Sequence, residues 1–230
     1  NNINVHSFAI KNKHTNIKLN SIKKIGKKFE IGIKQNKLIK YFFVSLIFEN
    51  YIKNLLAAIT VISLFRNIRK LDKNIFYSHE VPEGRGDISK ITMGKKSFFL
   101  VDESYNSNPL SLKSAIENFD RIKNKKNKKH LILGDMLDLG SHSKKLHLEV
   151  SKIINSTSID KVNVIGKHIK ETYKNIHNHK KGIILKETEQ IIDLIKRNID
   201  NNDHLMIKGS NSTELHQITN YLKKGKINAL

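Results

Sequence analysis

The sequence predicts an α/β fold with a mainly parallel sheet that helices cover on both faces. Two features lead to this prediction. From about residue 80 onwards, short apolar runs alternate with longer segments whose apolar residues recur at helical spacing, and this alternation is typical of parallel sheets with crossover helices. In addition, polar side chains follow several of the apolar runs directly, at the edge where open α/β sheets bind ligands.

The first third of the chain predicts short strands, then one helix, then a linker. The expected strands are 5–10, 28–33 and 41–48. Residues 50–68 predict a helix because apolar residues recur near a spacing of 3.6. Residues 79–86 contain Pro82 and two glycines, which predict a linker and a domain boundary between residues 1–78 and 79–230.

The remainder of the chain predicts a hairpin followed by alternating strands and helices. The hairpin pairs 88–93 with 97–101 around Gly94-Lys95. The expected strands after it are 131–133, 161–165, 182–185 and 204–207. The expected helices are 110–122, 143–154, 169–175, 187–198 and 212–224.

Composition excludes several functional classes. The 230 residues contain no cysteine, so there is no disulfide framework, thiolate metal site or cysteine nucleophile, which fits a cytoplasmic protein. No apolar run approaches the ~20 residues of a membrane span. The longest, residues 55–65, fits a buried helix. The formal net charge of +21 is a feature of proteins that bind nucleic acid. However, the lysines are dispersed, and their densest cluster, Lys123–Lys129, is explained by a solvated loop.

The segment 101–109, Val-Asp-Glu-Ser-Tyr-Asn-Ser-Asn-Pro, carries the strongest functional signal. It follows an apolar strand and precedes a helix, so its two carboxylates, phenol and two carboxamides lie at a carboxyl strand end. Carboxylates there can hold ribose hydroxyls, and asparagine side chains offer the paired donor and acceptor that suit an adenine edge. The alternative is a polar loop closed by an Asn/Pro helix start, since both residues are common there.

Six motifs in sequence order resemble the Mur ligase family, and within it the ligases that add D-alanyl-D-alanine to the muramoyl tripeptide. The motifs are Asn54-Leu-Leu-Ala-Ala58, Gly84-Arg-Gly86, Asp102-Glu-Ser-Tyr-Asn-Ser-Asn-Pro109, Leu133-Gly-Asp-Met-Leu-Asp-Leu-Gly140, His147-Leu-Glu-Val150 and Lys208-Gly-Ser210. Other Mur-type ligases, the nearer enzyme alternative, usually carry a Tyr-Ala-His-type string where this chain has Ser104-Tyr105-Asn106. From a different class, a non-catalytic, basic nucleotide- or RNA-binding module with a Rossmann-like fold stays open as a second hypothesis.

The resemblance implies a domain organisation. Residues 79–230 would form a C-terminal Rossmann-like domain, and residues 1–78 the C-terminal part of a central α/β ATP-binding domain. The chain has no G-x-x-x-x-G-K-[ST] loop and begins at Asn1 without a methionine. We therefore expect a fragment of a longer protein that is inactive by itself.

The resemblance also implies a reaction. ATP would phosphorylate the free carboxylate of UDP-N-acetylmuramoyl-tripeptide, and the amine of D-alanyl-D-alanine would attack the acyl phosphate in a step of peptidoglycan synthesis. Mg²⁺ would accompany ATP, bound mostly by residues absent from this chain. We expect a cytoplasmic monomer that does not act on nucleic acid.

The resemblance implies nucleotide-binding roles for several residues. Arg85 is the expected catalytic residue, because a guanidinium can bridge phosphate oxygens. Asn54 would lie near the nucleotide or cap a helix. Glu103 would bind the ribose, while Asn106 and Asn108 would touch the adenine or shape its loop. At position 50 many relatives have His where this chain has Asn50, which puts that contact in doubt.

Other residues would bind the peptide substrates. Tyr105 would face the substrate carboxylate, with a packed ring as the alternative. Asp135 would orient the incoming amine or cap the next helix. Lys208 and Ser210 would bind the carboxylate of the dipeptide, or form a plain turn after the last strand. No metal pair is expected, since His142 and His147 do not share a helix face.

Overall fold

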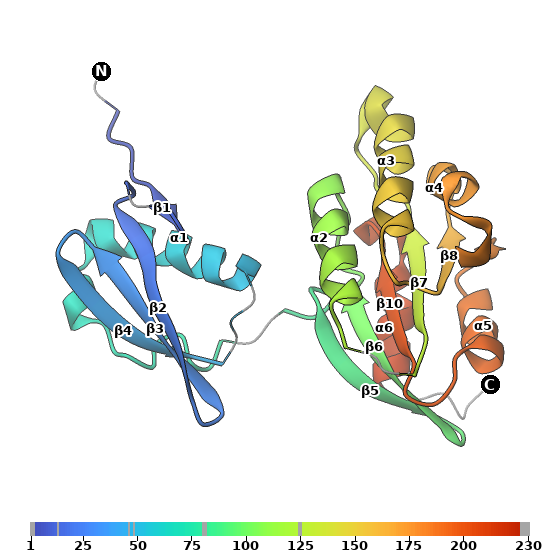
Figure 1. The fold of residues 1–230 in the computed structure, drawn as a ribbon, viewed down its shortest axis with the longest axis horizontal. Helices are drawn as coiled ribbons and strands as arrows, with labels where there is room; N and C mark the ends of the chain where they lie inside the picture. The colour runs from blue at the N-terminus through green and yellow to red at the C-terminus, as the bar shows by residue number, and fades with distance from the viewer. Residues whose placement is uncertain are drawn as a thin grey trace. The chain divides into compact units, whose positions relative to one another are not determined.

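The computed structural model describes residues 3–12, 14–45, 47, 49–79, 82–123 and 126–225, with only the backbone at residues 49 and 50. The chain forms two compact units, Asn1–Glu80 and Val81–Leu230 (Figure 1). Parts of the expected strand 41–48, of the linker 79–86 and of the lysine cluster 123–129 lie outside the described residues. Within the described part of the chain, no helix is long and apolar enough to cross a membrane.

The first unit is a four-stranded sheet with one helix packed on it. The strands, in spatial order, are β1 (Phe8–Ala9), β2 (Ile17–Ile25), β3 (Lys28–Gln35) and β4 (Leu38–Val44). β2, β3 and β4 are antiparallel, joined by tight turns at Gly26 and Asn36, which both have positive φ. Helix α1 (Glu49–Phe65) and the short 3-10 helix η1 (Ile68–Lys70) complete the unit.

Strand β2 is absent from the sequence prediction, and the expected strand 5–10 shrinks to two residues. The pairing of β2 with β3 shifts between Leu19 and Ser21, so a bulge interrupts the alternation of side chains. Beyond the bulge, Ile22 and Ile25 are exposed, at 44% and 37%. A strand whose apolar residues change face in the middle has no clean two-residue period, which is why the pattern does not reveal it.

The second unit confirms the predicted fold class. Its six-stranded sheet has the order β5-β6-β10-β7-β8-β9, in which only β5 runs antiparallel to its neighbour. The strands are β5 (Asp87–Met93), β6 (Lys96–Glu103), β7 (Lys129–Gly134), β8 (Lys161–Ile165), β9 (Lys181–Leu185) and β10 (His204–Lys208). The predicted hairpin around Gly94-Lys95 is present as β5 and β6.

Five α-helices lie on the two faces of this sheet (Figure 1). They are α2 (Pro109–Asp120), α3 (Ser143–Asn155), α4 (Lys170–Asn175), α5 (Gln190–Asn198) and α6 (Leu215–Lys223). Single 3-10 turns lie at η2 (Gly140–His142), η3 (Asn178–Lys180) and η4 (Asn211–Thr213). The last two helices begin three residues later than predicted, because the residues before them form turns.

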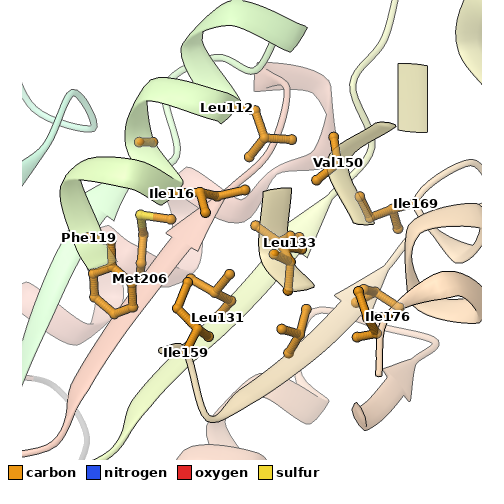
Figure 2. Packing of buried hydrophobic residues seen from close by; sticks show 14 of the residues in the cluster. Leu112, Ile116, Phe119, Leu131, Leu133, Val150, Ile159, Ile169, Ile176 and Met206 are labelled. Atoms are coloured by element: carbon orange, nitrogen blue, oxygen red, sulfur yellow. The ribbon is translucent and has the colours of Figure 1, made fainter. Parts of the chain in front are cut away.

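Alternating strand residues divide the core into two clusters. On β7, Leu131 and Leu133 pack with α2, α3 and α4, as Figure 2 shows from close by. Ile132 points the other way and joins the cluster under α5 and α6. All three side chains are fully buried. A strand buried on both faces reads as a continuous apolar run, as parallel sheets require.

The register brings three carboxyl strand ends together. Lys208, the last residue of β10, pairs with Glu103 on one side and Leu133 on the other. Because β5 is antiparallel to β6, its first residue Asp87 also lies at this end, opposite Asp102. The term carboxyl edge is used below for the ends of β6, β10 and β7, the loops that follow them, and the turn of residues 84–86.

Candidate functional site

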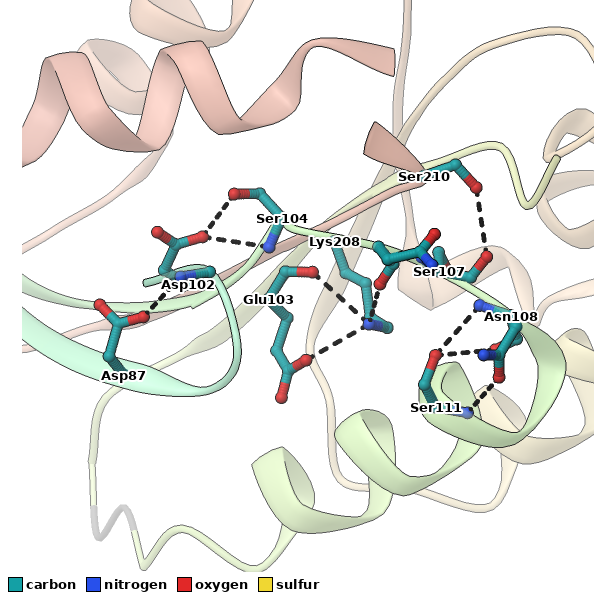
Figure 3. A network of polar contacts seen from close by, with 11 residues as sticks. Asp87, Asp102, Glu103, Ser104, Ser107, Asn108, Ser111, Lys208 and Ser210 are labelled. Atoms are coloured by element: carbon teal, nitrogen blue, oxygen red, sulfur yellow. Dashed lines mark hydrogen bonds and ion pairs between the residues drawn. The ribbon is translucent and has the colours of Figure 1, made fainter. Parts of the chain in front are cut away.

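Lys208 lies at the centre of the carboxyl edge (Figure 3). Its side chain is only 1% exposed, and its Nζ donates to the main-chain oxygen of Asn106 at 2.8 Å and to Glu103 Oε2 at 3.3 Å. Burial lowers the pKa of Lys208, while the Glu103 carboxylate opposes that shift. The ammonium therefore holds the loop after β6, and its contact with a peptide carboxylate stays a prediction.

Glu103 lies between Lys208 and the turn before β5. Its side chain is 21% exposed, and burial raises its pKa against the opposing effect of Lys208. Oε2 accepts from Lys208, whereas Oε1 lies so close to Gly86 that an added Cβ there would be 3.0 Å away. Glycine at position 86 thus leaves room for the carboxylate, which keeps an oxygen for a hydroxyl donor such as a ribose.

Arg85 is held over the ring of Tyr105, with its Cζ 4.3 Å from the ring centroid. The turn around it is bonded to β6 and the following loop: Gly86 donates to the Asp102 oxygen at 2.7 Å, and the Gly84 oxygen accepts from the Tyr105 amide at 3.1 Å. Both glycines have positive φ, of 75° and 96°. Arg85 is exposed, and its cation–π contact gives it a defined place at the carboxyl edge.

The two asparagines of the loop differ in role. Asn108 caps α2, since its Oδ1 accepts from the Ser111 amide at 2.8 Å and Ser111 Oγ accepts from the Asn108 amide in return. Asn106 is exposed, and its Oδ1 accepts from the next amide at 2.8 Å. Of the two alternatives given above, Asn108 therefore shapes the loop, while Asn106 stays a candidate for base contact.

Ser210 joins the three loops of the carboxyl edge. Its Oγ accepts from the Leu137 amide at 2.9 Å and donates to the Ser107 oxygen at 3.2 Å, while its own amide donates to the Asp135 oxygen at 3.0 Å. The residue is 5% exposed. The sequence analysis does not predict the partners Ser107 and Leu137. Both bond to Ser210 through main-chain atoms, which every residue type has.

Asp135 is a capping residue, for a different helix than expected. Its Oδ1 accepts from the Ile169 amide at 2.7 Å and its Oδ2 from the Lys167 amide at 3.0 Å, so it caps the entry to α4 rather than α3. The side chain is buried, and a Cβ on Gly166 would lie 2.6 Å from it. The role of this carboxylate in orienting an amine stays a prediction.

His147 supports the loop after β7 from within α3. Its Nε2 accepts from the Met136 amide at 3.1 Å, and its Nδ1 lies 2.8 Å from the Ser143 oxygen. This pair of contacts fits the neutral ring with its proton on Nδ1. Burial lowers the pKa of His147, which favours the same neutral form.

Asn54 belongs to the first unit and does not join this group of residues. Asn54 is exposed and is the sixth residue of α1, so it neither starts nor caps the helix. The side chain of Asn50 is outside the described part of the structure. The nucleotide contact inferred for Asn54 stays a prediction.

The next feature is the arrangement of potential metal donors. No group of three or more His, Cys, Asp or Glu side chains there is arranged to hold a metal ion. The aspartates of the carboxyl edge are instead bonded to amides, hydroxyls and a lysine.

The fold and the site together identify the class of protein. Residues 91–211 match the profile of the Mur ligase family described as "Mur ligase, glutamate ligase domain". The match covers more than half of the chain, which therefore belongs to this family.

Curated relatives give a narrower comparison. The UDP-N-acetylmuramoyl-tripeptide–D-alanyl-D-alanine ligase of Rickettsia prowazekii is 24% identical over 218 residues, covering 95% of this chain and 47% of its own length. The enzyme of the same name from Buchnera aphidicola is 32% identical over 128 residues, which is 54% of this chain and 27% of that protein. The chain thus spans about half the length, or less, of these relatives.

Solved structures share the fold. A MurF ligase from Thermotoga maritima in complex with ADP superposes with a TM-score of 0.69 and 17% identity, covering 95% of this chain and 48% of that one. MurF from Acinetobacter baumannii gives a TM-score of 0.71 at 17% identity, with 95% and 47% covered.

Proposed function

We propose that this chain is the C-terminal portion of an ATP-dependent ligase that adds D-alanyl-D-alanine to UDP-N-acetylmuramoyl-tripeptide in peptidoglycan precursor synthesis. Residues 1–78 would be the end of its central ATP-binding domain, and residues 79–230 its C-terminal domain. The ligase would be a cytoplasmic monomer that does not act on nucleic acid. The names of the curated relatives support this proposal.

The observation that carries the proposal is the position of Arg85 at the carboxyl edge, stacked on Tyr105 and within the turn that packs on Glu103. A planar guanidinium suits phosphate oxygens, and a half-buried carboxylate suits ribose hydroxyls. Exposed Asn106 completes a set of side chains that match phosphate, sugar and base. These groups fit ATP, and Mg²⁺ would be bound mostly by residues absent from this chain.

Each group then has a distinct task. ATP, when bound, supplies the phosphoryl group that activates the tripeptide carboxylate. Arg85 would neutralise charge on the transferring phosphate and hold it in line, which is most of what such a reaction asks of a protein. Tyr105 limits the conformations of Arg85 and would line the path of the peptide substrates. Ser210 and Lys208 would act through the loops that they fix.

The test uses a protein of the relatives' full length that contains this chain. With ATP, UDP-N-acetylmuramoyl-tripeptide and D-alanyl-D-alanine, it should release phosphate and form the pentapeptide, detected by mass spectrometry. Arg85→Lys should lower turnover roughly tenfold or more, since the planar fork is lost while the charge is kept. Arg121→Lys is the matched control, because Arg121 follows α2 and its exposed side chain donates to Asn118 on the same helix.

Two results would contradict the proposal at different levels. A full-length protein that forms no pentapeptide from the three substrates would refute the ligase function. Full turnover by Arg85→Lys at saturating ATP would leave the reaction in place and refute the role of the arginine. The 230-residue chain alone should give no turnover above background.

A further inference from the structure

Lys223, the last residue of α6, reaches the sheet beside the carboxyl edge. Its Nζ lies 2.6 Å from Asp87 Oδ2 and 2.5 Å from Asp102 Oδ2, and its side chain is 16% exposed. Burial opposes the charge on this lysine, but the two carboxylates outweigh that effect and raise its pKa. One ammonium group therefore bridges the first strand of the sheet to the second.

The two aspartates are direct neighbours that repel one another. Asp87 of β5 and Asp102 of β6 pair across the strands (Figure 3). Like charges placed opposite each other in a sheet are destabilising unless a cation lies between them. Asp102 is fixed, because it is 1% exposed and its Oδ1 accepts from the amide and hydroxyl of Ser104. Asp87 starts an edge strand and has more freedom to turn away.

The same two aspartates hold the turn that carries Arg85. Asp87 Oδ1 accepts from the Gly84 amide at 2.9 Å. The main-chain oxygen of Asp102 accepts from the Gly86 amide at 2.7 Å. The residues on either side of Arg85 are thus bonded to the pair that Lys223 neutralises. Without that cation, repulsion would drive Asp87 outwards and free the Gly84 amide.

We propose that Lys223 is a positioning residue for Arg85, acting through Asp87, Asp102 and the turn of residues 84–86. The role of Arg85 in phosphoryl transfer rests on the proposed function, but the positioning itself does not. It concerns a chain of contacts within the second unit and can be tested without any substrate. Neither the family match nor the sequence motifs include Lys223.

The first test is nuclear magnetic resonance on the 230-residue chain. In Lys223→Met, the Gly84 and Gly86 amide signals should shift, the Gly84 amide should exchange about tenfold faster, and contacts between Arg85 and the Tyr105 ring should weaken. Lys223→Arg should restore them, since a guanidinium can bridge two carboxylates. Lys96→Met is the matched control. Lys96 also forms an ion pair with an aspartate, Asp200, but it is the first residue of β6 and so lies at the end of the strand away from the carboxyl edge.

Unchanged Gly84 and Gly86 signals in Lys223→Met would overturn the proposal. If that variant does not fold, Asp87→Ala replaces it, because it removes the carboxylate that joins Lys223 to the Gly84 amide. This variant should also release Arg85 from the Tyr105 ring. Persistence of that contact in Asp87→Ala would equally refute positioning through this carboxylate.

The second test is a double-mutant cycle in the full-length protein. If Lys223 acts through Arg85, Lys223→Met should lower turnover in the wild-type background and add little in an Arg85→Ala background. A merely structural role would lower both by the same factor, and Lys96→Met should change neither. A wild-type protein without turnover would refute the proposed function alone, and the resonance measurements would still decide the positioning role.

Discussion

The Nζ of Lys208 and the main-chain oxygen of Asn106 are 2.8 Å apart, although the residues are separated by about a hundred positions in the sequence. This bond joins the end of β10 to the loop after β6. Lys208 therefore supports the loop that carries Tyr105 and Asn106.

Lys208→Met should destabilise the second unit by about 2–4 kcal/mol, because it leaves the partly buried Glu103 carboxylate without its cation. Urea unfolding measures the change. Lys174→Met is the control, since the Lys174 ammonium is exposed and its pair with Glu171 on α4 should contribute little stability. Combining Lys208→Met with Glu103→Gln should recover part of the loss. A cost equal to that of the control would contradict the buried pairing.

Ser210→Ala should loosen three loops at once. Loss of the hydroxyl leaves the Leu137 amide and the Ser107 oxygen without their partner, at a cost of about 1–3 kcal/mol. Hydrogen exchange at Leu137 should accelerate while the strand amides of β7 stay protected. Ser156→Ala provides the comparison, because its hydroxyl donates to the nearby Ile153 oxygen at a helix end. Similar exchange at Leu137 in both variants would be evidence against the bridging role.

Gly166→Ala should be among the most damaging single-methyl additions in the chain. Gly166 has φ 128°, and a Cβ would lie 2.6 Å from the Asp135 carboxylate that caps α4. We expect a loss of about 2–4 kcal/mol from backbone strain together with the lost cap. Gly94→Ala separates the two terms, because its φ is 60° and nothing lies within 4 Å, so only about 1–2 kcal/mol should be lost. Thermal unfolding of both variants gives the comparison.

The stability of the second unit should fall as the pH drops below about 6.5, the ordinary histidine value. Burial lowers the pKa of His147, and likewise of His130 and His204, so the unfolded chain binds protons first. Between the folded and unfolded pKa values, the free energy of unfolding therefore rises with pH and then levels off. His147→Gln should flatten this slope, and exposed His6→Gln should not. An unchanged slope in His147→Gln would exclude a contribution from that ring.

Much of the fold is predictable because burial leaves a periodic pattern. The strands of the second unit and the hairpin at Gly94-Lys95 follow from apolar runs and turn residues. The strand β2 does not, because a bulge moves its apolar residues from one face to the other. A shift in pairing depends on how two strands align, and a single sequence does not show that alignment.

The candidate site is predictable in location and only partly in role. The carboxyl edge follows from polar residues after strands, and the structure brings Arg85, Glu103, Tyr105, Asn106, Lys208 and Ser210 together there. The sequence does not show that the side chains of Asp135, Asn108 and Lys208 form hydrogen bonds with main-chain groups. The chemistry of a carboxylate or an ammonium is the same for a cap and for a ligand, so only the neighbours decide.

The direction of β5 explains how a residue near the start of the second unit can serve its carboxyl edge. A parallel first strand would begin at the far end of the sheet, about 24 Å away for the 7 residues of β5. Because β5 runs the other way, the polypeptide enters the domain at the edge where its neighbours finish. The entry of the chain into the second unit and the candidate site therefore lie at the same edge of the sheet.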